Sequence, residues 1–268
     1  MNSTDKLFLI LEQFTAEKPD WGVRELADAT SLKPNLVHWY LKNLERHRIV
    51  RRDPETQRYE LAFGLFELSQ RIQRLTLIER IAKPILRRLA KSTEGTTVLR
   101  VLDGDELLCV ATVDSPASLK VQFTTGTRVP INFGSVGKVV MAFLPPARLK
   151  SLLSKGSLKR FTEKTVTNPA VLAKQLAQIR ARGWVSTVGE AVPGVRGIAA
   201  PVRDKTGEVC GGVGLTFPAS ALAESQLQKT ARMVVRAANS ISAQLGWKAA
   251  KRTSPHAGAR TLRKLATC

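Results

Sequence analysis

Residues 26–44 read LADATSLKPNLVHWYLKNL, and this stretch decides the fold of the N-terminal part of the chain. Leu26 and Ala27 lie in a short predicted helix, and residues 30–32 make a tight connection to the next helix. Pro34 suits the first turn of that next helix, because the missing N–H would have no helical partner there in any case. Two helices joined by so short a turn are typical of a helix-turn-helix.

The second of these helices, predicted over residues 34–44, has two faces of different character. Apolar residues at helical spacing form the inward face: Leu36, Val37, Tyr40, Leu41 and Leu44. Three polar residues and a tryptophan share the outward face: Asn35, His38, Trp39 and Lys42. An α-helix fits the major groove of DNA with one face toward the base edges, so we predict that this helix is a DNA recognition helix.

The flanking sequence completes a small domain. An earlier helix is predicted from four apolar residues on one face: Leu7, Ile10, Leu11 and Phe14. Residues 49–52 and 58–61 alternate around a Pro-containing turn at residues 53–55, which predicts a β-hairpin. Three helices followed by a hairpin predict a winged helix-turn-helix over residues 1–63.

Each outward side chain of the predicted recognition helix suits a particular contact. Asn35 can form a bidentate pair with adenine, and His38 can donate or accept at a base edge. Lys33 and Lys42 can reach guanine or phosphate. Trp39 is expected to pack on a thymine methyl group or on the sugar backbone. Packing of Trp39 against the connecting helix or a partner subunit is the alternative.

The predicted hairpin adds three arginines, Arg51, Arg52 and Arg58, which suit phosphates or the minor groove and would position the domain without specifying sequence. The alternative is that these arginines are ordinary solvated side chains. Residues 31–52 carry a local net charge of +5, whereas residues 1–60 have no net charge. The formal charge of +20 on the whole chain favours a polyanionic partner, and it leaves a non-specific, nucleoid-type DNA binder as a rival function.

Composition argues against several other classes. The three cysteines are widely spaced, which argues against a disulfide framework and a zinc site. No histidine lies between residues 48 and 255, so a hydrolase with a histidine base has no candidate there. We expect no catalytic residue, metal or cofactor; a sensory or enzymatic protein that retains a helix-turn-helix is the remaining rival. The sequence contains no signal-peptide pattern and no apolar run of about 20 residues, so a cytoplasmic protein is expected.

Beyond residue 63 the pattern changes. Residues 64–80 are expected to form a linker helix, and Pro84 is expected to break or kink the helical pattern that continues to residue 93. Residues 81–246 mix β-branched runs with helical ones, which predicts an α/β or α+β domain. Strands are expected at 97–102, 107–113, 119–123, 183–187, 198–203 and 209–217, and helices at 137–144, 147–154, 169–182 and 220–245. The basic tail, residues 247–268, has no acidic residue and is expected to be disordered.

Three stretches together carry a family resemblance. They are residues 26–32 with Val37, His38, Leu41 and Leu44; residues 130–138, PINFGSVGK; and residues 193–202, PGVRGIAAPV. The chain resembles the IclR family of bacterial transcriptional regulators over about residues 3–246. The resemblance implies an α+β fold, with a winged helix-turn-helix followed by an effector-binding domain built on a GAF-like curved sheet. It also implies a homodimer or tetramer on palindromic double-stranded operator DNA, and a small effector, often a carboxylic or aromatic acid.

Three segments of the predicted effector-binding domain can converge on one site: a helix N-terminus within residues 130–138, the loop over residues 187–197, and the strand at residues 210–216. Backbone N–H groups at a helix N-terminus bind a carboxylate well. The predicted effector-binding residues are Ser135, Val136, Thr187, Gly197, Gly214 and Thr216. Lys138 can instead be a salt-bridge partner, and Arg196 can brace its loop without touching ligand.

Two features of this predicted pocket suggest the kind of effector. Thr187 stands where relatives often carry an acidic residue, so the pocket has lost a negative charge. Gly134, Gly197 and Gly214 are expected to leave the pocket roomy, although glycines in a strand equally suit tight packing. We therefore predict a larger, monoanionic effector such as an aromatic acid.

Overall fold

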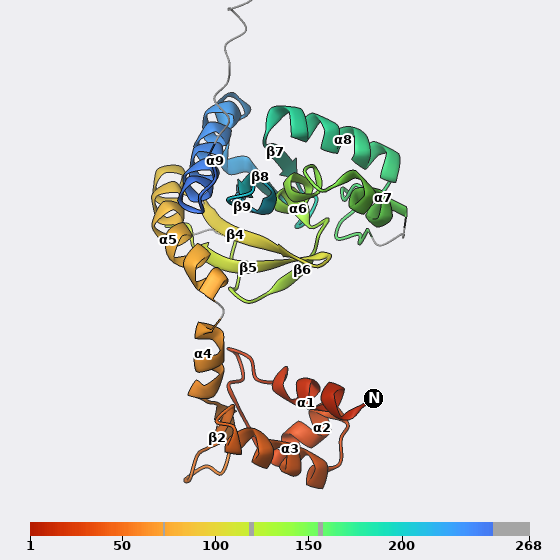
Figure 1. Cartoon of the computed structure of the whole chain (residues 1–268), viewed down its shortest axis with the longest axis vertical. Coiled ribbons are helices and arrows are strands. Elements are labelled where there is room, and N and C mark those ends of the chain that lie inside the picture. Colours follow the sequence, from red (N-terminus) through yellow and green to blue (C-terminus); the bar gives the residue numbers. More distant parts are fainter. Residues whose placement is uncertain (72, 118–120, 155–157, 249–268) are drawn as a thin grey trace, which may run out of the picture. The chain divides into compact units, whose positions relative to one another are not determined.

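The computed structural model describes residues 1–71, 73–117, 121–154 and 158–248, which form two compact units (Figure 1). The first unit comprises residues 1–76 and the second begins at Leu77. The linker helix predicted over residues 64–80 is two helices, α4 (Phe63–Gln70) and α5 (Gln73–Thr93). Helix α5 runs through Pro84, so the break expected there does not occur.

The first unit is a winged helix-turn-helix, as the sequence predicts. Its elements are α1 (Ser3–Leu11), β1 (Asp20–Trp21), α2 (Val23–Thr30), α3 (Pro34–Arg46), β2 (Val50–Arg52), β3 (Tyr59–Leu61) and α4. The three short strands pair antiparallel in the order β1-β3-β2. Ser31 ends α2 in a left-handed conformation with φ of 55°, and Pro34 opens α3 at its first turn. This sharp connection fixes the crossing of the two helices.

The inward face of α3 forms the core of the first unit. Val37 and Leu41 are fully buried, and they pack with Ile10 and Leu26 from the two preceding helices. The hydroxyl of Tyr40 donates to the carbonyl oxygen of Ser3 over 2.9 Å, which ties α3 to the start of the chain. Burial of this face holds the opposite face of α3 toward solvent.

The second unit is a six-stranded antiparallel sheet covered by helices on both faces. The strand order is β6-β5-β4-β9-β8-β7. The strands are β4 (Thr96–Asp103), β5 (Glu106–Val113), β6 (Arg128–Pro130), β7 (Val185–Val188), β8 (Val195–Arg203) and β9 (Val209–Pro218). The helices are α5, α6 (Gly134–Met141), α7 (Pro146–Ser154), α8 (Pro169–Arg182) and α9 (Glu224–Gln244), with a 3-10 turn at Ala219–Ala221. Figure 1 shows α5 and α9 on one side of the sheet and α6, α7 and α8 on the other. The predicted α+β class is therefore confirmed.

Some predicted elements differ from those observed. The strand expected at residues 119–123 is absent from its described part, residues 121–123, and β1 and β6 were not predicted. Most of the predicted basic tail, residues 249–268, lies outside the described residues. In the described part of the chain, no helix is long and apolar enough to cross a membrane.

Candidate nucleic-acid interface and ligand cavity

The outward face of α3 presents the predicted DNA-contacting residues to solvent. All five predicted residues on this helix or directly before it are exposed: Lys33, Asn35, His38, Trp39 and Lys42. The indole of Trp39 is 58% exposed and meets the ring of Tyr40 edge-on, with 5.0 Å between the ring centroids. Most of the indole is therefore open to a partner of this helix.

Two of the predicted cations make exposed ion pairs. Lys42 lies 2.9 Å from Glu45 on the same helix, and Arg51 lies 2.5 Å from Glu60 across the hairpin. Exposed pairs of this kind contribute only about 0–1 kcal/mol, so both cations can exchange their partners for phosphates. Arg52 is also exposed, and its guanidinium lies 5.6 Å from the ring centre of Tyr59.

Arg58, the third predicted wing cation, makes two ion pairs within the first unit. Its guanidinium donates to the carboxylate of Asp20 and, over 2.7 Å, to the carboxylate of Glu25. These bonds raise the pKa of Arg58, and the bonds that Glu25 accepts from the Gly22 N–H and from Arg58 lower the pKa of Glu25. Arg58 thus joins the strand that it precedes to β1 and α2. Because these bonds engage Nε and Nη2 of Arg58, they compete with the phosphate contact predicted for this residue.

In the second unit, the predicted effector residues gather around one cavity between the sheet and the N-terminus of α6. Five of the six line it: Ser135, Val136, Thr187, Gly197 and Thr216. Gly214 does not line it, because Val136 and Val98 cover the backbone at that position. The cavity volume is about 30 Å³, enough for small polar groups but not for a whole aromatic acid without side-chain movement.

Close packing around three glycines explains why the cavity is small. A methyl group at Gly197 would lie 2.7 Å from Ser135 Oγ, and one at Gly214 would lie 2.7 Å from Val136 Cγ2. A methyl group at Gly134 would lie 3.0 Å from Ala191 Cβ. The expectation that these glycines leave the pocket roomy is wrong, since α6 and its neighbours occupy the space. Tight packing, the alternative for the strand glycines, is what the structure shows.

Several polar groups point to anion binding in this cavity. Because Ser135 and Val136 lie in the first turn of α6, their backbone N–H groups have no partner within the helix. In the described part of the chain, the hydroxyls of Ser135 and Thr187 also lack a hydrogen-bond partner. The Thr216 hydroxyl donates to the carbonyl of Thr96 over 3.3 Å and keeps its acceptor sites. The cavity thus offers both donors and acceptors to a ligand.

Sequence reasoning missed Arg100 on β4, which among the described residues is the one charged side chain that lines this cavity. Only 4% of Arg100 is exposed, and its guanidinium carbon lies 4.7 Å from the ring centre of Phe123 and 5.2 Å from that of Phe133. The signal was an arginine in the otherwise apolar stretch of residues 97–102, TVLRVL. Such a residue needs a special reason to be buried.

Comparison with known proteins decides the family. Residues 3–54 match the IclR helix-turn-helix domain, and residues 70–243 match the bacterial transcriptional regulator IclR C-terminal family. The chain belongs to the IclR family. The HTH-type transcriptional regulator KdgR of Escherichia coli is 33% identical over 248 residues, which cover 92% of this chain and 94% of KdgR.

Solved structures agree with this assignment. The crystal structure of the Thermotoga maritima IclR is 29% identical with a TM-score of 0.78, covering 92% of this chain and 100% of that one. An IclR homologue from Microbacterium hydrocarbonoxydans, complexed with 4-hydroxybenzoate, has the same fold, with a TM-score of 0.80 and 22% identity over 91% of this chain and 99% of its own. This IclR-family chain is therefore a ligand-responsive helix-turn-helix transcriptional regulator, and its relatives are regulators, not enzymes.

Lys138 and Arg196, for which the sequence left a structural role open, both form ion pairs within this IclR-family domain. Lys138 on α6 pairs with the carboxylate of Glu190 and donates to Gln175 Oε1 over 2.8 Å. Arg196 pairs with Glu224 at 2.9 Å, from β8 to the start of α9. Lys138 thereby connects α6, α8 and the loop that carries Ala191 of the cavity wall.

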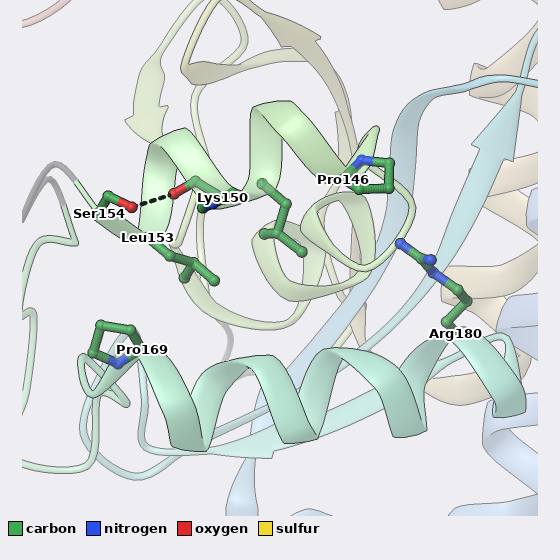
Figure 2. A pocket seen from close by; sticks show the side chains of 7 residues that line it. Pro146, Lys150, Leu153, Ser154, Pro169 and Arg180 are labelled. Carbon is green, nitrogen blue, oxygen red and sulfur yellow. Dashed lines mark hydrogen bonds between the residues drawn. The ribbon is translucent and has the colours of Figure 1, made fainter.

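A larger hollow of about 360 Å³ lies between α7 and α8, outside the predicted site. Figure 2 shows Pro146, Leu153 and Pro169 along it, with Arg180 at one end. Arg180 Nε donates to the carbonyl of Ala142 over 2.6 Å, so this cation is committed to the backbone. None of the predicted effector residues lines this hollow.

Proposed function

We propose that this regulator reads operator DNA with the outward face of α3 and that a small organic acid, bound in the cavity beside α6, changes its affinity for that DNA. The observation that carries the proposal is the pairing, in one IclR-family chain, of a solvent-exposed polar helix face with an anion-compatible cavity. The regulator works as a cytoplasmic homodimer or tetramer, because palindromic operators call for a symmetric protein.

On the DNA side, the base-reading residues are Asn35, His38 and Trp39, while lysines and wing arginines hold the phosphates. The polar face of α3 supports this division, since no part of its inward face is available. The phosphate-contacting residues are Lys33, Lys42, Arg51 and Arg52. Arg58 is left out of this set because Asp20 and Glu25 occupy its donors.

On the effector side, the ligand is an organic acid with an apolar body, such as an aromatic acid. The α6 amides of Ser135 and Val136 suit its carboxylate, and apolar side chains make up most of the cavity wall. The structural neighbour complexed with 4-hydroxybenzoate supports the same class of ligand. Effector binding acts by differential affinity for two arrangements of the regulator, so effector and DNA affect each other's binding reciprocally.

The rival function is non-specific, charge-driven DNA binding, which the net charge of +20 favours. We expect the full chain to bind a fragment selected from its own genome about 10³-fold or more tightly than a scrambled duplex of equal length, at physiological salt. Fluorescence anisotropy titrations measure this ratio. Equal affinities for the two duplexes would favour the nucleoid-type binder and refute sequence-specific regulation.

A further inference from the structure

We propose that Arg100 is the anion-binding residue of the effector cavity, and that the effector is a monocarboxylate held in the plane of its guanidinium. This inference rests on the proposed function of the cavity as the effector site. It adds a residue outside the predicted site and a structural reason for the single negative charge of the ligand.

Arg100 is a buried cation that has no anionic partner among the described residues. It is 96% buried, and its Nε, which is completely buried, has no hydrogen-bond partner. Among the described residues no carboxylate pairs with it. A buried, unpaired charge is costly to the free protein, and guanidinium remains protonated in proteins. An anionic ligand would remove that cost on binding.

The described side chains around Arg100 do not supply the missing negative charge. Cys109 on β5 is the nearest titratable neighbour in register with Arg100, but burial raises the pKa of the Cys109 thiol, so it stays neutral. Thr187, Ser135 and Thr216 are the polar side chains that share the cavity wall, and all three are uncharged. Glu190 lies close by in sequence to the wall residue Ala191, but it is paired with Lys138.

The surroundings of the Arg100 guanidinium leave its plane available to a carboxylate. Two phenyl rings, Phe123 and Phe133, lie 4.7 and 5.2 Å from the guanidinium carbon. Aromatic rings favour the faces of a guanidinium, whereas its N–H groups point outward in its plane. The planar fork matches a carboxylate in a bidentate pair. The first turn of α6, with Ser135 and Val136, lines the same cavity and adds backbone donors for the same group.

The lining of the cavity sets the charge and size of the ligand. Among the described residues Arg100 is the only charged one in the lining, so one negative charge neutralises it and a second would be buried unpaired. A volume of about 30 Å³ accommodates the carboxylate end only. The apolar body then lies against the partly buried Phe123 and Val121 and the exposed Val192, which have room to move.

The test measures binding of benzoate and phenylacetate to the full chain by calorimetry, with benzamide and phthalate as uncharged and dianionic comparisons. We expect benzoate and phenylacetate to bind, and benzamide and phthalate to bind at least about 30-fold more weakly. Benzamide has no charge to pair with Arg100, and the second carboxylate of phthalate would be buried without a partner. Arg100→Gln should reduce benzoate binding by at least the same factor, and Arg100→Lys by less.

Arg203→Gln is the matched control, because Arg203 also stacks on aromatic rings, those of Phe143 and Trp247, but outside the cavity. Benzoate binding should be unchanged in it. Equal binding to the wild type and to Arg100→Gln would overturn the role of Arg100 while leaving an acid effector intact. If neither benzoate nor phenylacetate binds, both this inference and the proposal of an acid effector are wrong. The proposal of operator binding is tested separately, by the DNA titrations.

A second measurement does not depend on how well the variants fold. A crystal of the wild-type chain soaked in 4-bromobenzoate locates the bromine by anomalous scattering. We expect the carboxylate within hydrogen-bond distance of Arg100 and the bromine near Val192. A bromine site elsewhere, for example in the hollow between α7 and α8 (Figure 2), would contradict the proposal.

Discussion

Lys138→Met is expected to lower the free energy of unfolding of the second unit by about 3–5 kcal/mol, because it leaves the Glu190 carboxylate partly buried without its cation. The Lys138 side chain is 5% exposed and that of Glu190 is 15% exposed, so water cannot replace the missing partner well. The loop around Glu190 is also held by Thr162 and Thr165, whose hydroxyls donate over 2.7 Å to the carbonyls of Gly189 and Glu190. Chemical denaturation followed by the fluorescence of Trp184 measures the loss.

The control for this prediction is the double variant Lys138→Met with Glu190→Gln. It removes both charges and should recover a substantial part of the lost stability, because the uncompensated carboxylate is gone. Lys150→Met, at an exposed position on α7, should change stability by less than about 0.5 kcal/mol. A Lys138→Met protein as stable as the wild type would show that the buried pair is not a significant restraint on the cavity loop.

Asn35→Ala is expected to weaken binding to operator DNA by about 1–3 kcal/mol, or roughly 5- to 150-fold, while leaving the affinity for scrambled DNA almost unchanged. Asn35 is exposed in the first turn of α3, where an amide can form a bidentate pair with adenine. Its loss removes a base contact but no phosphate contact. Anisotropy titrations of both duplexes, and of operators varied one base pair at a time, measure the effect and locate the base read.

Asn43→Ala on the same helix is the matched control. The Asn43 side chain donates to the carbonyl of Trp39 over 2.7 Å, so it is committed within α3. We expect this variant to keep the preference for operator over scrambled DNA. If Asn35→Ala weakens both duplexes equally, Asn35 contributes to general affinity and the base-reading role assigned to it is wrong.

The pattern of neighbouring residues was sufficient to predict the helix-turn-helix and its recognition helix. The 3.6-residue period of α3 separates its buried face, with Val37 and Leu41, from its exposed face, and Pro34 marks its start. A helix pattern is a property of neighbouring residues, so the sequence reports it directly. Short strands such as β6, with only three residues, carry too little pattern to be predicted and depend on pairing with β5.

Features that depend on contacts between residues far apart in the sequence could not be predicted from local patterns. Arg58 pairs with Asp20 and Glu25, which lie 38 and 33 residues earlier, and no local pattern predicted these ion pairs. The room beside Gly214 is filled by Val136 and Val98 from other elements, which the glycine itself does not reveal. Arg100 becomes an anion-site candidate because folding buries it without a hydrogen-bond partner for Nε and brings Phe123 and Phe133 beside it from separate segments.

The most direct test of the account is the operator affinity of the full chain with and without saturating monocarboxylate, using whichever of benzoate and phenylacetate binds more tightly. The account predicts a change in operator affinity of about 5- to 150-fold, no change for scrambled DNA, and no response in Arg100→Gln. An acid that binds the wild-type chain tightly but leaves its operator affinity unaltered would contradict the claim that this cavity controls DNA binding.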